Sequence, residues 1–207
     1  MRDTIDINSN DNALFITSQC NNRCVMCCQP PLLRNDLDGY FQKNMALIDS
    51  APRELRSLGI TGGEPTLLGD RLFELLRHVR TKLPETEIHL LTNGRAFADK
   101  EYARKLAECG EEKILLGVPL HADSAGDHDT ITQVKGSFEE TMLGLYNLGR
   151  YDIGIELRVV ITKMNYRRLP KLPDFIYRNL PFVEFISLMG LEYTCLLYTS
   201  DAADDLI

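Results

Sequence analysis

Four cysteines lie close together near the start of the chain, in a spacing typical of a metal site. Cys20, Cys24 and Cys27 form a CxxxCxxC array, and Cys28 follows directly. Four thiolates hold a complete [4Fe–4S] cluster, whereas three leave one iron with an open position. The array therefore predicts an iron–sulfur cluster in which one iron is free to bind a substrate or cofactor.

Two other sites are compatible with these cysteines. A zinc ion could be completed by Cys28 or by a distant Cys or His, because structural zinc takes four Cys or three Cys and one His. Zinc ligands usually come as two separated pairs, however, and the chain contains no second CxxC. A redox dithiol formed by Cys24 and Cys27 would leave Cys20 without a role.

The second motif that could do chemistry is TGGEPT at residues 61–66. Its paired glycines, Gly62 and Gly63, let a ligand approach the backbone, and Glu64 supplies a carboxylate beside exposed main-chain groups. This combination suits a cationic amino group. Taken alone, the motif fits an ordinary turn between a strand and a helix better. Its position relative to the cysteines decides in favour of binding.

Six apolar, β-rich runs alternate with segments of helical period. The runs occupy residues 13–18, 58–61, 88–92, 113–118, 153–162 and 183–189, and clear helical segments occupy residues 70–83, 99–109 and 137–148. This alternation indicates βαβ units and a mainly parallel sheet, so we expect an α/β fold. In the last helical segment, Ser137 and Glu140 have the spacing of a capping box, which predicts that Ser137 caps the helix.

A right-handed series of six such units forms either an open doubly wound sheet or a partial barrel. Both architectures place functional groups at the carboxyl ends of the strands. The cysteine array follows the first run and TGGEPT follows the second. The two motifs are therefore expected to meet at one edge of the sheet.

The composition excludes several classes of protein. With 207 residues, 44% hydrophobic and 26% charged, the chain reads as a soluble globular protein, not a disordered or fibrous one. Its net charge of −7 and lack of a basic run argue against a nucleic-acid partner. We find neither an apolar run of about 20 residues for a membrane span nor an apolar leader. A cytoplasmic location with reduced thiols is expected.

The two motifs together resemble the signature of the radical S-adenosylmethionine (SAM) enzymes, over about residues 14–193. The resemblance implies a partial (β/α)6 barrel, here truncated at the C-terminus. It implies that Cys20, Cys24 and Cys27 bind a [4Fe–4S] cluster whose fourth iron is chelated by SAM. Reductive cleavage of SAM would then give methionine and a 5′-deoxyadenosyl radical that abstracts a substrate hydrogen, while the protein positions the reactants.

The resemblance also assigns roles around SAM. Gly62, Gly63 and Glu64 match the motif that receives the amino group of SAM. Met26, directly before the third cysteine, matches a large apolar residue near the adenine, although simple packing of the loop explains it equally well.

Asn93, in a TNG turn after the third run, matches a polar residue that faces SAM, and its alternative role is to form a tight turn. Arg158 matches a position that meets the SAM carboxylate in several members, or it is structural. After the fourth run, Pro119 stands where many members place a SAM-contacting Ser. Either His121 or Asp123 would then supply the polar contact, or this part of the site binds SAM differently. A single histidine there is more typical of a solvated loop.

Finer similarity points to one group of maturases. The CNNRCVMCCQPP segment, together with the pattern at residues 117–138, looks like the radical SAM maturases of the His-Xaa-Ser system, which are thought to modify a small partner peptide. This implies a peptide or small protein substrate and a reductant such as flavodoxin or ferredoxin. Maturases of the SPASM type and activating enzymes are the nearest alternatives within the family, and a noncatalytic Fe–S or zinc binding module is the alternative outside it.

The last residues do not continue the pattern before them. From Cys195 the chain reads CLLYTSDAADD, which looks like a translated sequencing adapter. We therefore expect a lead-in at residues 1–12, a radical SAM core at 13–194 and a non-native tail at 195–207. Cys195 is not expected to be a ligand, and a C-terminal portion with substrate-binding elements is expected to be missing.

Overall fold

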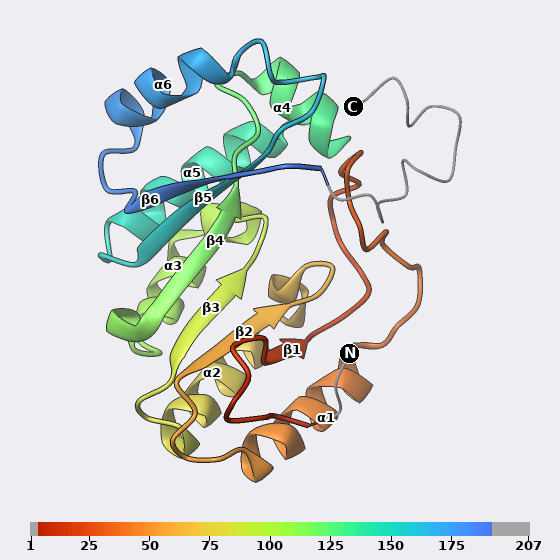
Figure 1. The fold of residues 1–207 in the computed structure, drawn as a ribbon, viewed down its shortest axis with the longest axis vertical. Helices are drawn as coiled ribbons and strands as arrows, with labels where there is room; N and C mark the ends of the chain where they lie inside the picture. Colours follow the sequence, from red (N-terminus) through yellow and green to blue (C-terminus); the bar gives the residue numbers. More distant parts are fainter. Residues whose placement is uncertain (1–3, 192–207) are drawn as a thin grey trace.

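The structure is a computed structural model that describes residues 4–191. A single six-stranded sheet runs through it, and all neighbouring strands are parallel. The sheet is curved, with its major helices along one side (Figure 1). The predicted non-native tail at 195–207 lies outside the described residues.

The order of the strands in space equals their order in the chain. A doubly wound sheet would show a reversal of this order, so the sheet is singly wound and the predicted partial (β/α)6 barrel is confirmed. Among the described residues, β1 and β6 form the two unpaired edges. The strands are β1 (Ala13–Phe15), β2 (Ser57–Thr61), β3 (Glu87–Leu91), β4 (Ile114–Pro119), β5 (Gly154–Val160) and β6 (Phe185–Met189).

The first strand is shorter than predicted because the chain turns away to begin the cysteine segment. Ile16 still donates its amide to the carbonyl oxygen of Thr61, at 2.8 Å. The hydroxyls of Thr17 and Ser18 then donate to the carboxylate of Asp36, just before the first helix. The amide of Ser18 also donates to this carboxylate, at 3.1 Å, rather than to a neighbouring strand.

The two faces of the sheet have different surroundings. Alternate residues along each strand point to opposite faces, and in β1 to β5 one set is almost fully buried beneath the helices. Their partners on the concave face are mostly half-buried. The buried set includes Leu14, Ile16, Leu58, Ile60, Ile88, Leu90, Leu116, Val118, Leu157 and Val159, each no more than 1% exposed. The concave face is therefore the one available to ligands.

Six α-helices accompany the strands in the described part of the chain. The three predicted helices are present with small shifts at their ends, and three others had no individual prediction. The helices are α1 (Leu37–Ser50), α2 (Asp70–Lys82), α3 (Lys100–Ala107), α4 (Ala125–Thr132), α5 (Ser137–Gly149) and α6 (Leu172–Asn179). Short 3-10 turns η1 (Pro65–Leu68), η2 (Arg95–Ala98), η3 (Glu111–Lys113) and η4 (Leu169–Lys171) precede α2, α3, β4 and α6. No helix within residues 4–191 is both long and apolar enough to cross a membrane.

The capping box predicted for α5 is wrong. Gly136, at φ 85°, is the N-cap, and Ser137 is already helical. The carboxylate of Asp129 caps this helix from α4 instead, accepting hydrogen bonds from the amides of Gly136 and Phe138 at 2.6 and 2.9 Å. The Ser137 hydroxyl also donates to Asp129, at 2.9 Å, so it is not available to cap the helix.

Helix α5 clamps the turn that follows β3. A Cβ atom on Gly144 would lie 2.2 Å from the carbonyl oxygen of Gly94, so only glycine permits this contact. Thr141 donates to the carbonyl oxygen of Asn93 at 3.1 Å, and Asn147 donates to that of Phe97 at 2.9 Å. Because of these contacts, α5 fixes the position of the TNG turn.

We predict that Gly144→Ala lowers the free energy of unfolding by about 1–3 kcal/mol, because the added methyl group overpacks this contact. Urea denaturation would measure the change. Gly126→Ala is the matched control, because a Cβ atom there meets no atom within 4 Å. The control should be unchanged or more stable by up to about 1 kcal/mol, since alanine favours helix. Equal stability of the two variants would contradict the prediction.

Candidate functional site

The segment at residues 20–28, here called the cysteine loop, connects β1 to the approach of α1. Its backbone docks on the C-terminal end of α4: the amides of Arg23 and Val25 donate to the carbonyl oxygens of Thr132 and Ile131, at 3.0 and 2.9 Å. The loop is therefore held by elements far away in the sequence.

The three thiols of the array lie near one another. Burial raises the pKa of Cys20 to about 11 and that of Cys24 to about 12, and repulsion between neighbouring thiolates adds to both shifts. Burial likewise raises the pKa of Cys27, whereas Cys28 is exposed. The first three thiols thus form a group from which Cys28 differs in its surroundings.

Soft thiolates that gather on one loop fit the donor set of an iron–sulfur cluster. A [4Fe–4S] cluster spreads its ligands over several iron atoms, whereas zinc requires its ligands to converge on one ion at about 2.3 Å. No group of three or more His, Cys, Asp or Glu side chains within residues 4–191 is placed to hold a metal ion in this structure, so the choice between cluster and zinc rests on the donor types and their spacing in the loop. Cys20, Cys24 and Cys27 are the residues that would hold the cluster.

The paired glycines allow the turn after β2 to pack against the residues that directly precede the cysteine loop. Gly63 and Glu64 donate their amides to the carbonyl oxygens of Thr17 and Gln19, at 2.7 and 2.8 Å. A Cβ atom on Gly63 would lie only 2.0 Å from the Gln19 oxygen, and Gly62 has a φ of 152°. The two predicted motifs therefore do meet at the carboxyl ends of β1 and β2.

Glu64 is the buried centre of this edge, with only 1% of its surface exposed. Its Oε1 accepts hydrogen bonds from the amide and hydroxyl of Thr66, at 3.0 and 2.7 Å, and from the hydroxyl of Thr92, at 2.6 Å. Its Oε2 accepts from the amide of Asn93 at 2.7 Å. Burial raises the pKa of this carboxyl, and the four hydrogen bonds oppose the rise.

Asn93 connects the TNG turn to the cysteine loop. Its Nδ2 donates to Oδ1 of Asn21 at 2.6 Å, and its own Oδ1 accepts from the amide of Arg95 at 3.0 Å. Gly94 has a φ of 79°, so the tight turn considered from sequence is also present. Asn93 thus belongs to a tight turn and also contacts the cysteine loop.

Met26 is 7% exposed, as expected for an apolar residue packed within the loop. Arg158 lies on the concave face of β5, farther along the sheet. Its Nη1 donates to the carboxylate of Glu156 at 3.2 Å, and its Nη2 contacts the sulfur of Met189 at 3.1 Å. The thioether is a weak acceptor, so the guanidinium retains capacity to bind an oxygen ligand.

A polar cluster that the sequence reasoning did not identify surrounds Glu156. This carboxylate is 4% exposed, lies 2.8 Å from Nε2 of His89 on β3 and accepts a short hydrogen bond from Ser187. Burial would raise its pKa, but Ser187, Arg158 and His89 together hold the pKa below its usual range. A Cβ atom on Gly117 would lie 3.0 Å from Nε2 of His89. The absence of a side chain on this residue of β4 therefore lets His89 on β3 extend across β4 to Glu156 on β5.

One signal in the sequence could have found Glu156. Apolar Ile155, Leu157 and Val159 alternate with Gly154, Glu156 and Arg158, which places two opposite charges on the same face of β5. The participation of His89 had no such signal, because it depends on the glycine between the two strands.

His121 is buried, at 3% exposed, rather than in the solvated loop expected for a single histidine. Its ring stacks on that of His128 with centroids 5.7 Å apart, and its amide donates to Nδ1 of His128 at 3.3 Å. Nδ1 of His121 has no hydrogen-bond partner among the described residues. Asp123, the other candidate, pairs with Arg168 at 2.8 Å.

Burial lowers the pKa of His121 to about 3, with a further contribution from His128, whose own pKa is lowered by burial to about 4. Both rings are therefore neutral at pH 7.

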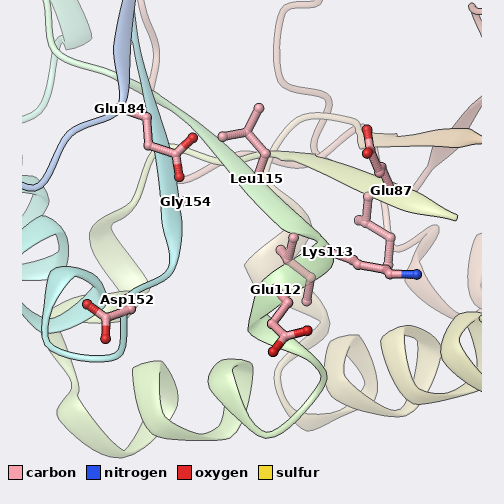
Figure 2. A pocket seen from close by; sticks show the side chains of 9 residues that line it. Glu87, Glu112, Lys113, Leu115, Asp152, Gly154 and Glu184 are labelled. Carbon is pink, nitrogen blue, oxygen red and sulfur yellow. The ribbon is translucent and has the colours of Figure 1, made fainter. Parts of the chain in front are cut away.

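A separate acidic hollow of about 280 Å³ lies at the amino ends of the strands, opposite the candidate site. Figure 2 shows the side chains that line it, among them Glu87, Glu112, Asp152 and Glu184, with Lys113 as the basic member. Lys113 pairs with Glu85 at 2.6 Å. In barrels of parallel strands this end contributes to stability rather than to chemistry.

We predict that Glu64→Gln lowers the free energy of unfolding of the metal-free protein by about 1–3 kcal/mol, because an amide cannot accept from all four donors. Glu139→Gln, at an exposed position of α5, is the matched control and should change stability by less than about 0.5 kcal/mol. Urea titrations of both variants would measure the difference. Equal stability of the two would contradict the central role of Glu64.

The buried histidines predict a loss of stability in acid. Because both native pKa values lie below the usual 6.5, the unfolded chain binds more protons, and stability falls as the pH decreases from about 6.5 towards 4. In His121→Gln, the slope of unfolding free energy against pH should be smaller than in the parent by up to about 1.4 kcal/mol per pH unit. Urea denaturation at several pH values would measure it, and an unchanged slope would refute the assignment.

Comparison with known proteins identifies the superfamily. A family model described as the Radical SAM superfamily matches residues 14–176. Fe-coproporphyrin III synthase from Methanosarcina barkeri is 33% identical over 78% of this chain and 39% of its own length. The tungsten-containing aldehyde ferredoxin oxidoreductase cofactor-modifying protein from Pyrococcus furiosus is 28% identical over 79% of this chain and 47% of its own. The chain thus spans less than half the length of these two relatives.

Solved structures share the fold. Streptococcus suis SuiB bound to S-adenosylmethionine superposes with a TM-score of 0.67 and 18% identity, covering 87% of this chain and 40% of SuiB. Native anSMEcpe with bound AdoMet and the Cp18Cys peptide gives a TM-score of 0.62 and 21% identity, covering 86% of this chain and 50% of that one. Members of the family use a [4Fe–4S] cluster and S-adenosylmethionine. By the match to its family model, the chain belongs to the radical SAM superfamily.

Proposed function

We propose that Cys20, Cys24 and Cys27 bind a [4Fe–4S] cluster through which this chain cleaves SAM and modifies a peptide or protein. The observation that supports this most directly is the meeting of the loop that carries three half-buried thiols with the GGE turn at one edge of the sheet. When bound, the cluster supplies one electron that splits SAM into methionine and a 5′-deoxyadenosyl radical. A flavodoxin or ferredoxin is the proposed reductant, and the cytoplasm the proposed location.

The chain's own residues would bind SAM at this edge. Gly62, Gly63 and Glu64 are proposed to receive its amino group, with Asn93 beside them. Glu64 already accepts four hydrogen bonds, so its part is to keep the two turns in place while main-chain groups at the glycines meet the ligand. Met26 would pack near the adenine.

Two further residues are proposed to bind the rest of SAM. Arg158 has a guanidinium that donates only weakly to Met189 on one side, so it can donate to the carboxylate of SAM there. His121 would use its unpartnered Nδ1, since a neutral ring in a dry environment gains from a polar contact.

A peptide substrate agrees with two structural neighbours: anSMEcpe is described with a bound peptide, and SuiB with its precursor peptide SuiA. Within this class we propose a maturase of the His-Xaa-Ser type, on the segments at residues 20–31 and 117–138. A second candidate is a tetrapyrrole substrate, since the relative from Methanosarcina barkeri is named Fe-coproporphyrin III synthase.

We predict that anaerobic reconstitution with iron and sulfide gives a cluster in the parent and in Cys28→Ala but not in Cys24→Ala. Electron paramagnetic resonance of the dithionite-reduced protein should show a [4Fe–4S] signal that shifts when SAM is added, because SAM would bind the open iron. Chromatography should detect 5′-deoxyadenosine. Equal cluster content in all three proteins, or a single zinc ion in place of the cluster, would overturn the proposal and favour a noncatalytic binding module.

The substrate class is tested separately. The reconstituted protein with SAM and reductant should change the mass of a synthetic peptide of His-Xaa-Ser repeats, as measured by mass spectrometry. Conversion of coproporphyrin with an unchanged peptide would favour the second candidate instead.

A further inference from the structure

Arg95 binds the cysteine loop from the first turn of η2. Its Nη1 donates to the main-chain oxygen of Asn21 at 2.8 Å and to Oδ1 of Asn22 at 2.7 Å. Its Nε donates to the carboxylate of Glu140 on α5 at 2.6 Å. One guanidinium therefore joins the loop to the helix that clamps the TNG turn.

The contact to Asn22 orients a group that touches the thiols. Because Oδ1 of Asn22 accepts from Arg95, this residue is held beside the thiols, and its side chain opposes the rise in the pKa of Cys24. The main-chain amide of Asn22 meets the Cys20 sulfur at 3.3 Å. Asn22 is 3% exposed, so water does not compete freely for these donors.

A second brace fixes the neighbouring residue. Asn93 donates to Oδ1 of Asn21 at 2.6 Å while it accepts from the amide of Arg95. Asn21 is thus held at both its main-chain oxygen and its side chain. Hydrogen bonds from the TNG turn and from Arg95 therefore fix the position of the segment between Cys20 and Cys24.

We propose that Arg95 is a positioning residue for the cluster: by holding Asn21 and Asn22 it directs the main-chain amide of Asn22 at the sulfur of Cys20 and so raises the cluster's reduction potential. The inference rests on the proposed cluster ligands. An N–H group donated to a thiolate stabilises negative charge on sulfur, and the reduced cluster carries one electron more than the oxidised one. Hydrogen bonds to the sulfurs are among the features that set such potentials.

This role needs the geometry of the guanidinium and not its charge alone. Nη1 bonds to two neutral oxygens of the loop, while Nε bonds to a carboxylate, which is a fork that a lysine ammonium cannot reproduce. An ordinary exposed ion pair would contribute little and would tolerate lysine. Arg95→Lys therefore separates the two explanations.

The experiment is an anaerobic redox titration of the full reconstituted chain, followed by electron paramagnetic resonance, in which dithionite supplies one electron per cluster. At a fixed solution potential near the parent's midpoint, Arg95→Lys and Asn22→Leu should each show about a tenfold lower ratio of reduced to oxidised cluster. This corresponds to about 59 mV for a one-electron couple. Arg104→Lys, an exposed α3 arginine paired with Glu101 and Glu108, is the matched control and should keep the parent ratio.

A further variant is needed in case Arg95→Lys or Asn22→Leu does not bind a cluster. Glu140→Gln removes only the negative charge of the outer anchor of Arg95, and it should lower the same ratio by a smaller factor while the metal-free protein unfolds at the parent temperature. Parent-like ratios in Arg95→Lys and Asn22→Leu, with a cluster formed in the parent, would overturn this inference and leave the proposed function intact. Absence of a cluster in the parent would overturn both.

Discussion

The buried carboxylate of Glu64 is the interaction on which the site depends. It accepts hydrogen bonds from residues of two separate turns, those after β2 and β3, and it does so with almost no exposure to water. A carboxylate is costly to bury unless donors surround it. The four donors lie on backbone and hydroxyl groups whose positions the strands already fix, so the carboxylate and the sheet stabilise each other. Any ligand at this edge meets a preorganised surface.

Three glycines permit the close approaches that this arrangement needs. Gly63 lets the turn after β2 touch Gln19, and Gly144 lets α5 touch the turn after β3. Gly117 opens β4 so that His89 and Glu156 meet above it. In each case the missing side chain lies between two elements that belong to different βα units. The path from α5 through the TNG turn to the cysteine loop therefore starts from a close backbone contact at Gly144 and continues through short polar side chains and Arg95.

The parts of the fold and site that were predictable depend on local sequence. The strands and the CxxxCxxC and GGE motifs can be recognised from sequence because each is defined by the spacing of its own residues. The strand order then confirms the predicted partial barrel. The failures arose where a partner came from elsewhere in the chain. Ser137 lost its predicted capping role to Asp129, and His121 is buried because His128 packs against it. Spacing cannot reveal such partners, since each depends on tertiary contacts.

The concave face divides into two parts with different demands. At the carboxyl ends of β1 to β3, backbone amides, glycines and Glu64 leave little freedom for substitution, because each group already has several partners. Along β5 and β6, Glu156, Arg158 and Ser187 project from regular strand positions, where a side chain can change without moving the backbone. Under the proposed function, most of the SAM contacts are thus tied to the fold itself, and Arg158 is the one proposed on a replaceable strand position. The same proposal directs the search for the substrate to Glu156 and Ser187 on β5 and β6, because these side chains face the concave side and are not assigned to SAM.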